Sequence, residues 1–139
     1  MLESCKAGAG RSGRAGPHPR CQRCAAHVEQ CFCDAVRALS LDTQVIAITH
    51  QREAGKPTNT ARLILLALSN AQVRIRGRKG EPLGTRGLVV PERRTLVLFP
   101  SDEAVELTAE VVAADPRPIT LVVPDGTWRQ ARRVLLREP

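Results

Sequence analysis

The chain has 139 residues, enough for one domain with a modest core and too few for two ordinary domains. Lys and Arg outnumber Asp and Glu by 21 to 14, and the resulting formal charge of +7 favours an anionic partner such as RNA. No apolar run approaches the roughly 18 residues of a membrane helix, and the amino-terminal residues lack the apolar segment of a signal peptide. We therefore expect a cytoplasmic protein without a membrane partner.

Residues 1–20 are rich in Gly, Arg, Ala and Pro and contain almost nothing to bury, so we predict a disordered leader. Four cysteines follow in the pattern C-x2-C-x6-C-x-C: Cys21, Cys24, Cys31 and Cys33. Four thiolates on one short segment suit tetrahedral zinc. Disulfide bonds are the alternative, but a reducing compartment and the closeness of Cys31 to Cys33 argue against them. His27 is a candidate to replace one ligand. Since protein would fill all four positions, we predict a structural zinc site at residues 21–34.

Apolar runs and helix signals alternate through the rest of the chain. This alternation predicts an α/β fold with a mostly parallel sheet and flanking helices, in which the loops converge on one edge. A short helix or turn is expected at residues 34–41. Strands are predicted at residues 43–49, 71–76, 95–99 and 119–123, and helices at residues 63–68, 101–114 and 128–136.

The ends of these elements carry local signals. Pro124 has no backbone N–H and is expected to end the last strand, whereas Thr127 and Gln130 have the spacing of a helix capping box. Ser101 is the expected N-cap of the helix at residues 101–114. The helix at residues 63–68 follows a cap at Thr58 or Asn59 and is apolar almost all round, so we expect it to be largely buried.

Polar segments follow two of the predicted strands. Residues 50–62 form a polar loop at the carboxyl end of the strand at residues 43–49, and ligands bind at that edge in open α/β sheets. Residues 74–94 hold seven basic side chains with four glycines between them, a composition that suits a phosphate backbone. A solvated loop is the alternative interpretation of this basic segment.

Five motifs, in this order, resemble the DTW-domain proteins, the tRNA-uridine aminocarboxypropyltransferases. They are the four cysteines, His50-x2-Glu53, Asn59-Thr60-x-Arg62-Leu63, Leu98-Phe99-Pro100-Ser101 and Asp125-Gly126-Thr127-Trp128. The resemblance covers residues 21–136 and implies a SPOUT-like fold. It also implies transfer of the 3-amino-3-carboxypropyl group of S-adenosylmethionine to N3 of a uridine in tRNA. Members of the family usually continue past the last helix, so a DTW domain at residues 21–139 would have an incomplete α/β core at residues 35–139.

The resemblance also implies roles for individual residues. Asp125 is the expected catalytic base, because uracil N3 retains its proton at neutral pH. No catalytic metal is required, and zinc would be structural. Arg62 is expected to face the donor's carboxylate or an RNA phosphate. The residues expected to bind substrate are His50, Glu53, Asn59, Thr60 and Arg62. The residues expected to cradle the donor are Leu98, Phe99, Pro100, Ser101, Asp125, Gly126, Thr127 and Trp128.

Two other functions fit the same residues. One is a non-catalytic, zinc-stabilised RNA-binding module, which needs the cysteines and the basic surface but no base at Asp125. The other is a SPOUT-like RNA methyltransferase, which would use the same donor but transfer its methyl group. Weighing the nucleosides of tRNA that has been incubated with the protein and S-adenosylmethionine separates the three functions.

Overall fold

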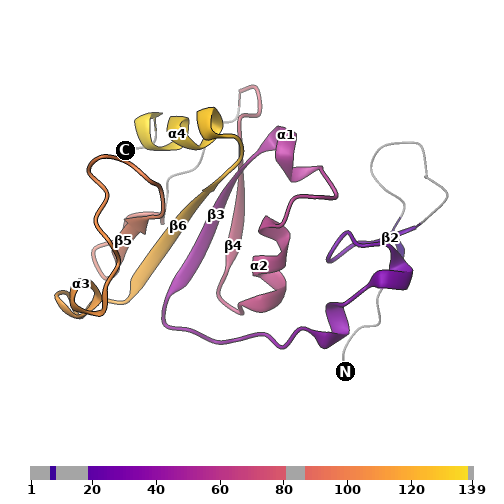
Figure 1. The fold of residues 1–139 in the computed structure, drawn as a ribbon, viewed down its shortest axis with the longest axis horizontal. Coiled ribbons are helices and arrows are strands. Elements are labelled where there is room, and N and C mark those ends of the chain that lie inside the picture. The colour runs from indigo at the N-terminus through magenta and orange to yellow at the C-terminus, as the bar shows by residue number, and fades with distance from the viewer. Residues whose placement is uncertain (1–6, 9–18, 81–86, 138–139) are drawn as a thin grey trace.

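A four-stranded parallel sheet forms the centre of the molecule (Figure 1). The computed structural model describes residues 7–8, 19–80 and 87–137. The strand order in the sheet is β4-β3-β6-β5, and all three neighbouring pairs are parallel. The strands are β3 (Gln44–His50), β4 (Gln72–Arg76), β5 (Arg94–Val97) and β6 (Ile119–Asp125). The predicted α/β fold with a mostly parallel sheet is confirmed.

Helices lie on both faces of this sheet. Helix α2 packs against β3 and β4, whereas α4 packs against β6 on the opposite face (Figure 1). Among the described residues, no helix has the length and apolar character needed to cross a bilayer. The helices are η1 (Val28–Gln30), η2 (Cys33–Ala35), α1 (Gln51–Ala54), α2 (Ala61–Ala67), α3 (Ala109–Ala113) and α4 (Trp128–Arg137).

The amino-terminal segment contains a small sheet of its own. Strands β1 (Ala7–Gly8) and β2 (Arg20–Cys21) pair in antiparallel fashion. Most of the leader predicted at residues 1–20 lies outside the described residues, so that its disorder stays a prediction.

The strand register decides which side chains share a face of the sheet. Thr49 pairs with Ile75 on one side and with Asp125 on the other, so these three side chains point the same way. They point toward α2, because Asp125 bonds with Asn59 just before that helix. The opposite face holds the buried apolar core, made of Ile46, Ile48, Leu88, Val122 and Val134.

Strand β6 continues through Pro124, contrary to the prediction that this proline ends it. Pro124 pairs with Ile48, and the strand runs to Asp125. Backbone groups of alternate residues point to opposite sides of a strand, and the carbonyl of Val122 accepts from Leu98 on the β5 side. The missing N–H of Pro124 therefore faces the β5 side, beyond the end of β5 at Val97, where the ladder needs no donor.

The helix predicted at residues 101–114 is much shorter. It is α3, and Thr108, not Ser101, caps it by accepting the N–H of Val111. Residues 101–107 are all exposed, and Val105 is 77% exposed. Since short helices depend on burying an apolar face, this segment lacks the packing that would hold it helical.

The end of β5 and the burial of α2 also differ from the predictions. Strand β5 ends at Val97, so that Leu98 and Phe99 lie beyond it. Helix α2 is only half buried, with Leu65 50% exposed, because among the described residues the sheet covers one side of the helix and the cysteine cluster covers only part of the rest.

The turn from β6 into α4 forms the predicted capping box. Gln130 Oε1 accepts the N–H of Thr127 at 2.8 Å, and Thr127 Oγ1 accepts the N–H of Gln130 at 3.4 Å. Gly126 has a φ of +153°, and a Cβ there would lie 2.8 Å from Gln130 Oε1. The motif therefore needs glycine at this position.

Replacing Gly126 with alanine should destabilise the protein by about 1–3 kcal/mol, because the backbone conformation and the capping box both exclude a Cβ. Urea unfolding followed by circular dichroism measures this. Gly55→Ala is the matched control, since Gly55 has a φ of −86° and nothing within 4 Å of its Cβ position. Equal stability of the two variants would contradict the capping geometry.

Candidate functional site

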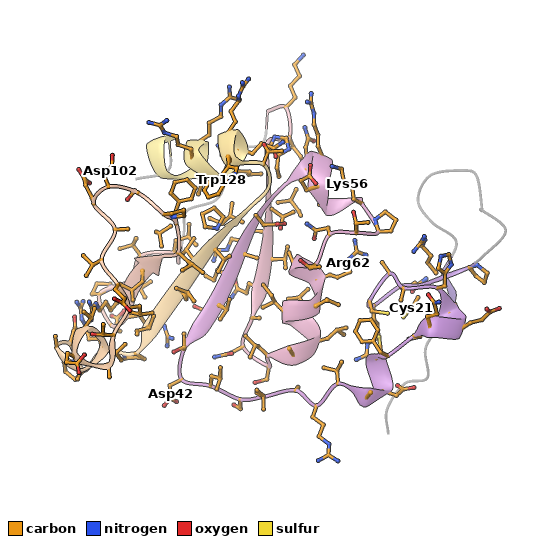
Figure 2. The ribbon with its side chains drawn as sticks, in the orientation of Figure 1. Cys21, Asp42, Lys56, Arg62, Asp102 and Trp128 are labelled. Atoms are coloured by element: carbon orange, nitrogen blue, oxygen red, sulfur yellow. The ribbon has the colours of Figure 1, made fainter. Side chains whose placement is uncertain are left out.

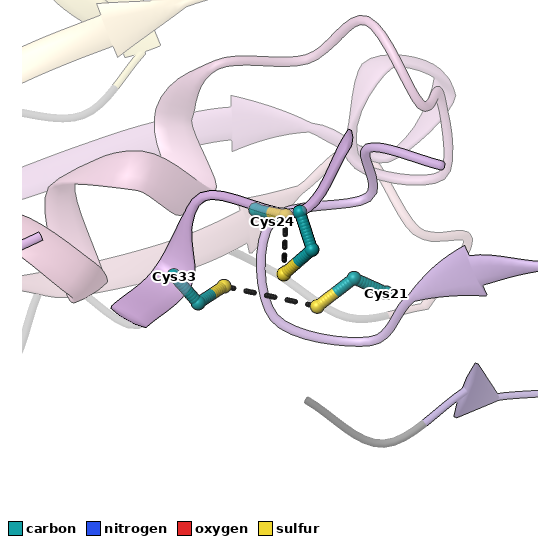
Figure 3. A group of neighbouring side chains, drawn as sticks. Cys21, Cys24 and Cys33 are labelled. Atoms are coloured by element: carbon teal, nitrogen blue, oxygen red, sulfur yellow. Dashed lines mark hydrogen bonds between the residues drawn. The ribbon is translucent and has the colours of Figure 1, made fainter. Parts of the chain in front are cut away.

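Four cysteine sulfurs converge at the amino-terminal end of the described domain. All lie within 4.8 Å of one another, with Cys21 3.7 Å from Cys33 and Cys24 3.9 Å from Cys31 (Figure 3). Zn–S bonds of about 2.3 Å place tetrahedral sulfurs about 3.8 Å apart, which these distances match. The thiols are free, not disulfide-bonded, and within the described residues this cluster does not include His27. The four sulfurs could hold a tetrahedral metal such as zinc.

The chemistry of the thiols fits a metal site. Burial, with the neighbouring thiols of Cys24 and Cys21, raises the pKa of the Cys33 thiol. A bound cation has the opposite effect, since a coordinating thiol is deprotonated. Ala25, in the turn after Cys24, has a φ of +60°, and its carbonyl accepts from Arg20 Nη1 at 2.9 Å. This turn brings the first two sulfurs together.

The cysteine cluster rests on the helix that leads to the sheet edge. Leu63 and Leu66 of α2 pack against the buried cysteines. The loop after η2 is tied to the same helix, because Leu39 donates to the carbonyl of Ala67 and accepts from Ser69. The four-cysteine segment therefore supports α2 by side-chain packing and by backbone hydrogen bonds.

We expect the purified protein to contain one zinc ion per chain, measurable by plasma mass spectrometry. Cys33→Ser should lose this zinc and part of the helical circular dichroism signal, because α2 packs on the cluster. Cys5→Ser is the control, since Cys5 lies outside the four-cysteine pattern. A Cys33→Ser variant that keeps a full equivalent of zinc would contradict the assignment.

Asp125 and Asn59 meet at the carboxyl edge of the sheet. Asn59 Nδ2 donates to Asp125 Oδ2 at 2.6 Å, across 66 residues of sequence. Asn59 Oδ1 accepts the N–H of Ala61 at 3.2 Å, which identifies the oxygen of the amide and fixes its orientation. The side-chain amide of Asn59 thus accepts a hydrogen bond from the first residue of α2 and donates one to Oδ2 of Asp125. Oδ1 of Asp125 remains able to accept from another donor.

Arg62 organises the loop that precedes α2. Its guanidinium donates to the carbonyls of Asn59 at 3.2 Å, Lys56 at 2.9 Å and Ala54 at 3.4 Å. The side chain therefore holds the backbone that carries Asn59 (Figure 2). Its expected contact with a donor carboxylate or a phosphate stays a prediction. Thr60 is the exposed N-cap residue of α2 and makes no side-chain cap bond.

His50 caps α1 through its ring. His50 Nδ1 accepts the N–H of Arg52 at 3.2 Å. Burial lowers the pKa of His50, and Arg52, Arg76 and Arg133 lower it further. These three arginines come from α1, β4 and α4, so positive charge from three elements surrounds the ring.

Glu53, the partner of His50 in its motif, lies on the same short helix. It forms an ion pair with Lys56 at 2.7 Å.

The lowered pKa of His50 makes stability dependent on pH. The unfolded state binds a proton at a higher pH than the folded state does, so stability should fall as pH drops below about 6.5. His50→Asn keeps a capping side chain that does not titrate. It should reduce the difference in unfolding free energy between pH 7.5 and 5.5, as measured by urea unfolding. An unchanged difference would show that other groups cause the pH dependence.

Phe99 and Trp128 bring the motifs at residues 98–101 and 125–128 together. Their ring centroids are 5.8 Å apart in an edge-to-face arrangement with an interplanar angle of 71°. Trp128 is 71% exposed, so its side chain does not pack in the apolar core (Figure 2). Leu98 is 58% exposed beside this pair, and Pro100 and Ser101 are also exposed. The pair forms an open apolar surface next to Gly126 and Thr127.

The structure divides the basic segment predicted at residues 74–94. Arg93 donates to Thr120 Oγ1 and to the carbonyl of Asp42, and Arg94 donates to the carbonyl of Val111. They lie where β5 begins, at the edge opposite Asp125, because parallel strands all begin at one edge. Sequence spacing did not reveal this separation. Residues 81–86 lie outside the described part of the chain.

One polar residue of the site was not predicted from sequence. Thr49 is completely buried at the end of β3, beside Asp125 in the strand register. It lies inside an apolar strand, where threonine is an ordinary residue. Only its position at the carboxyl end of that strand was a signal in the sequence.

The family model described as "DTW domain" matches residues 18–139. Proteins named tRNA-uridine aminocarboxypropyltransferase 2 from Macaca fascicularis and Mus musculus are each 29% identical to the chain over 124 residues. A protein of the same name from Drosophila melanogaster is 28% identical over 126 residues. These alignments cover 86% of this chain but 42–49% of the relatives, so the chain spans less than half of their length. No solved structure matches the chain.

Proposed function

Because the chain belongs to the DTW domain family, we propose that it modifies tRNA as an S-adenosylmethionine-dependent tRNA-uridine aminocarboxypropyltransferase. The names of the similar proteins support this reaction. The observation that carries it in this chain is the 2.6 Å bond between Asn59 and Asp125. This bond joins two separate family motifs at one edge of the sheet and orients a carboxylate there.

Asp125 is the proposed base. Uracil N3 carries a proton at neutral pH, and its lone pair becomes a good nucleophile when that proton is removed. Asp125 Oδ1 accepts the N3 proton while Asn59 holds Oδ2. Nitrogen N3 then forms a bond to the γ-carbon of the donor's methionine part. The γ-carbon–sulfur bond breaks, its electron pair stays on sulfur, and neutral methylthioadenosine leaves.

Choosing the γ-carbon over the methyl group is a problem of orientation, because both carbons are bound to the same sulfonium. The proposed cradle is residues 98–101 with residues 126–128. In it, Phe99 and Trp128 offer an exposed apolar surface to the donor's adenine. Gly126 lets the backbone approach the donor without a side chain.

The tRNA is proposed to approach the carboxyl edge of the sheet from the side of His50. Arg52, Arg76 and Arg133 supply positive charge around His50, which follows Thr49, the strand partner of Asp125. Such contacts release condensed counterions, so the affinity for tRNA should fall steeply with salt. His50, Glu53, Thr60 and Arg62 then act as the organisers of this substrate surface.

The metal site is proposed to support this edge, not to take part in the reaction. Bound zinc would hold four sulfurs and leave no position open for water. We also propose a leader at residues 1–20, a domain at residues 21–139 and a cytoplasmic location. A SPOUT-like arrangement of the core is part of the same proposal.

The test incubates the zinc-loaded protein with S-adenosylmethionine and unmodified tRNA, then weighs the digested nucleosides. We expect uridine carrying a 3-amino-3-carboxypropyl group. Asp125→Asn keeps an acceptor for Asn59 but removes the base, so the rate should fall by roughly 10²–10⁴-fold. Asp42→Asn, at the opposite edge of the sheet, is the control and should keep full activity (Figure 2).

Two results would reject the proposal. Methylated uridine would identify the alternative methyltransferase. Unmodified tRNA, with zinc present and salt-sensitive tRNA binding retained, would identify a non-catalytic RNA-binding module. Undiminished transfer by Asp125→Asn would instead reject only the assignment of the base.

A further inference from the structure

We propose that a small cavity beneath Asn59, between α2 and the sheet, holds the uracil ring of the target uridine, with the Thr49 hydroxyl as its buried polar contact. The inference rests on the proposed function and adds a binding site for the uracil ring. The cavity measures about 130 Å³. Its lining residues are Thr49, Ala54, Asn59, Arg62, Leu65, Val73 and Ile75.

The hydroxyl of Thr49 lacks a partner. Thr49 is 0% exposed, and among the described residues Thr49 Oγ1 has no hydrogen-bond partner. Leaving such a group unpaired is costly, so a buried hydroxyl normally has a bound partner. Since the residue lines the cavity, a ring in that cavity lies beside the hydroxyl, and a shift of the lining side chains that uncovers the buried Oγ1 lets the ring supply the missing bond.

The size of the cavity favours a single ring. Sites for drug-sized ligands measure about 300–1,000 Å³. A volume of about 130 Å³ is therefore too small for the whole donor. Leu65, Val73 and Ile75 make its walls apolar, which suits the two flat faces of a pyrimidine. An unstacked RNA base entering a pocket in this way is a common mode of recognition.

The arrangement around the cavity matches the polar edge of uracil. Both carbonyl oxygens of uracil flank N3, so a hydroxyl that binds either one places the N3 proton beside itself. Asp125 is the neighbour of Thr49 on the adjacent strand, about 4.8 Å away, and points to the same face. Asn59 lines the cavity and also holds Asp125 Oδ2. A ring on Thr49 would therefore present its N3 proton toward Asp125.

The experiment compares two fluorescent RNA oligomers of equal length, oligouridylate and its abasic counterpart, by anisotropy titration with the zinc-loaded full chain. The two oligomers carry equal backbone charges, so the ratio of their affinities measures the contribution of the uracil rings alone. We expect the wild type to prefer oligouridylate by at least tenfold. Thr49→Val keeps the shape and removes the hydroxyl, which should reduce the ratio roughly fivefold to tenfold. Thr49→Ser keeps the hydroxyl and should retain the ratio.

A second variant guards against misfolding of the first. Ala54→Phe fills the cavity from α1 and should also abolish the preference, while zinc content and affinity for the abasic oligomer stay unchanged. Affinity for S-adenosylmethionine, measured by calorimetry, should be unchanged in all three variants.

Three results would overturn the inference. They are equal wild-type affinity for both oligomers, a ratio that survives Thr49→Val and Ala54→Phe, and a loss of S-adenosylmethionine affinity in these variants. The second would mean that the hydroxyl binds only water, and the third that the cavity holds the donor. Binding is measured without transfer. A protein that is inactive but still prefers oligouridylate would therefore contradict the proposed reaction and still support the uracil site.

Discussion

The parallel pairing of β3 with β6 is the constraint on which the rest of the structure depends. Ile46, Ala47, Ile48 and Thr49 of β3 are at most 1% exposed, because strands lie on both sides and side chains cover both faces. The pairing joins segments more than 70 residues apart and places Asp125 next to Thr49. Parallel strands share one carboxyl edge, so the loops after β3, β4 and β6 meet there. Both the proposed base and the proposed cavity follow from that register.

A second support reaches the same edge from the cysteine cluster. Leu63 and Leu66 of α2 pack against the buried cysteines, and Ala61 and Arg62 at the amino end of α2 both donate hydrogen bonds to Asn59. Asn59 in turn holds Asp125. A metal held by the thiols would therefore act on the candidate site through packing and hydrogen bonds, at a distance from any reacting atom. In the proposed function, such a metal would support the site and take no part in the reaction.

Local signals in the sequence were correct where short-range chemistry decides the outcome. The spacing of the cysteines predicted their convergence, and the Thr127–Gln130 box formed as its residues indicate. Local signals gave wrong predictions where contacts with distant parts of the chain decide the structure. Ser101 is a good N-cap, yet no helix starts there because residues 101–107 have nothing to pack against. Pro124 lacks an N–H, yet β6 continues because β5 has already ended on that side. Arg93 and Arg94 are basic, yet they bond with backbone and Thr120 at the far edge.

The sequence by itself determined the fold class, the order of the strands along the chain, the cluster of four cysteines and the motifs that surround Asp125, because periodicity and spacing are local properties. Only the tertiary structure decided that Asn59, 66 residues away, is the partner of Asp125. It also decided that Arg62 holds a loop and that Thr49 lies buried without a partner among the described residues beside the carboxylate. These relations depend on strand register and on which face each side chain takes. Strand register and side-chain orientation are set only when distant segments of the chain pair, so no short stretch of sequence determines them.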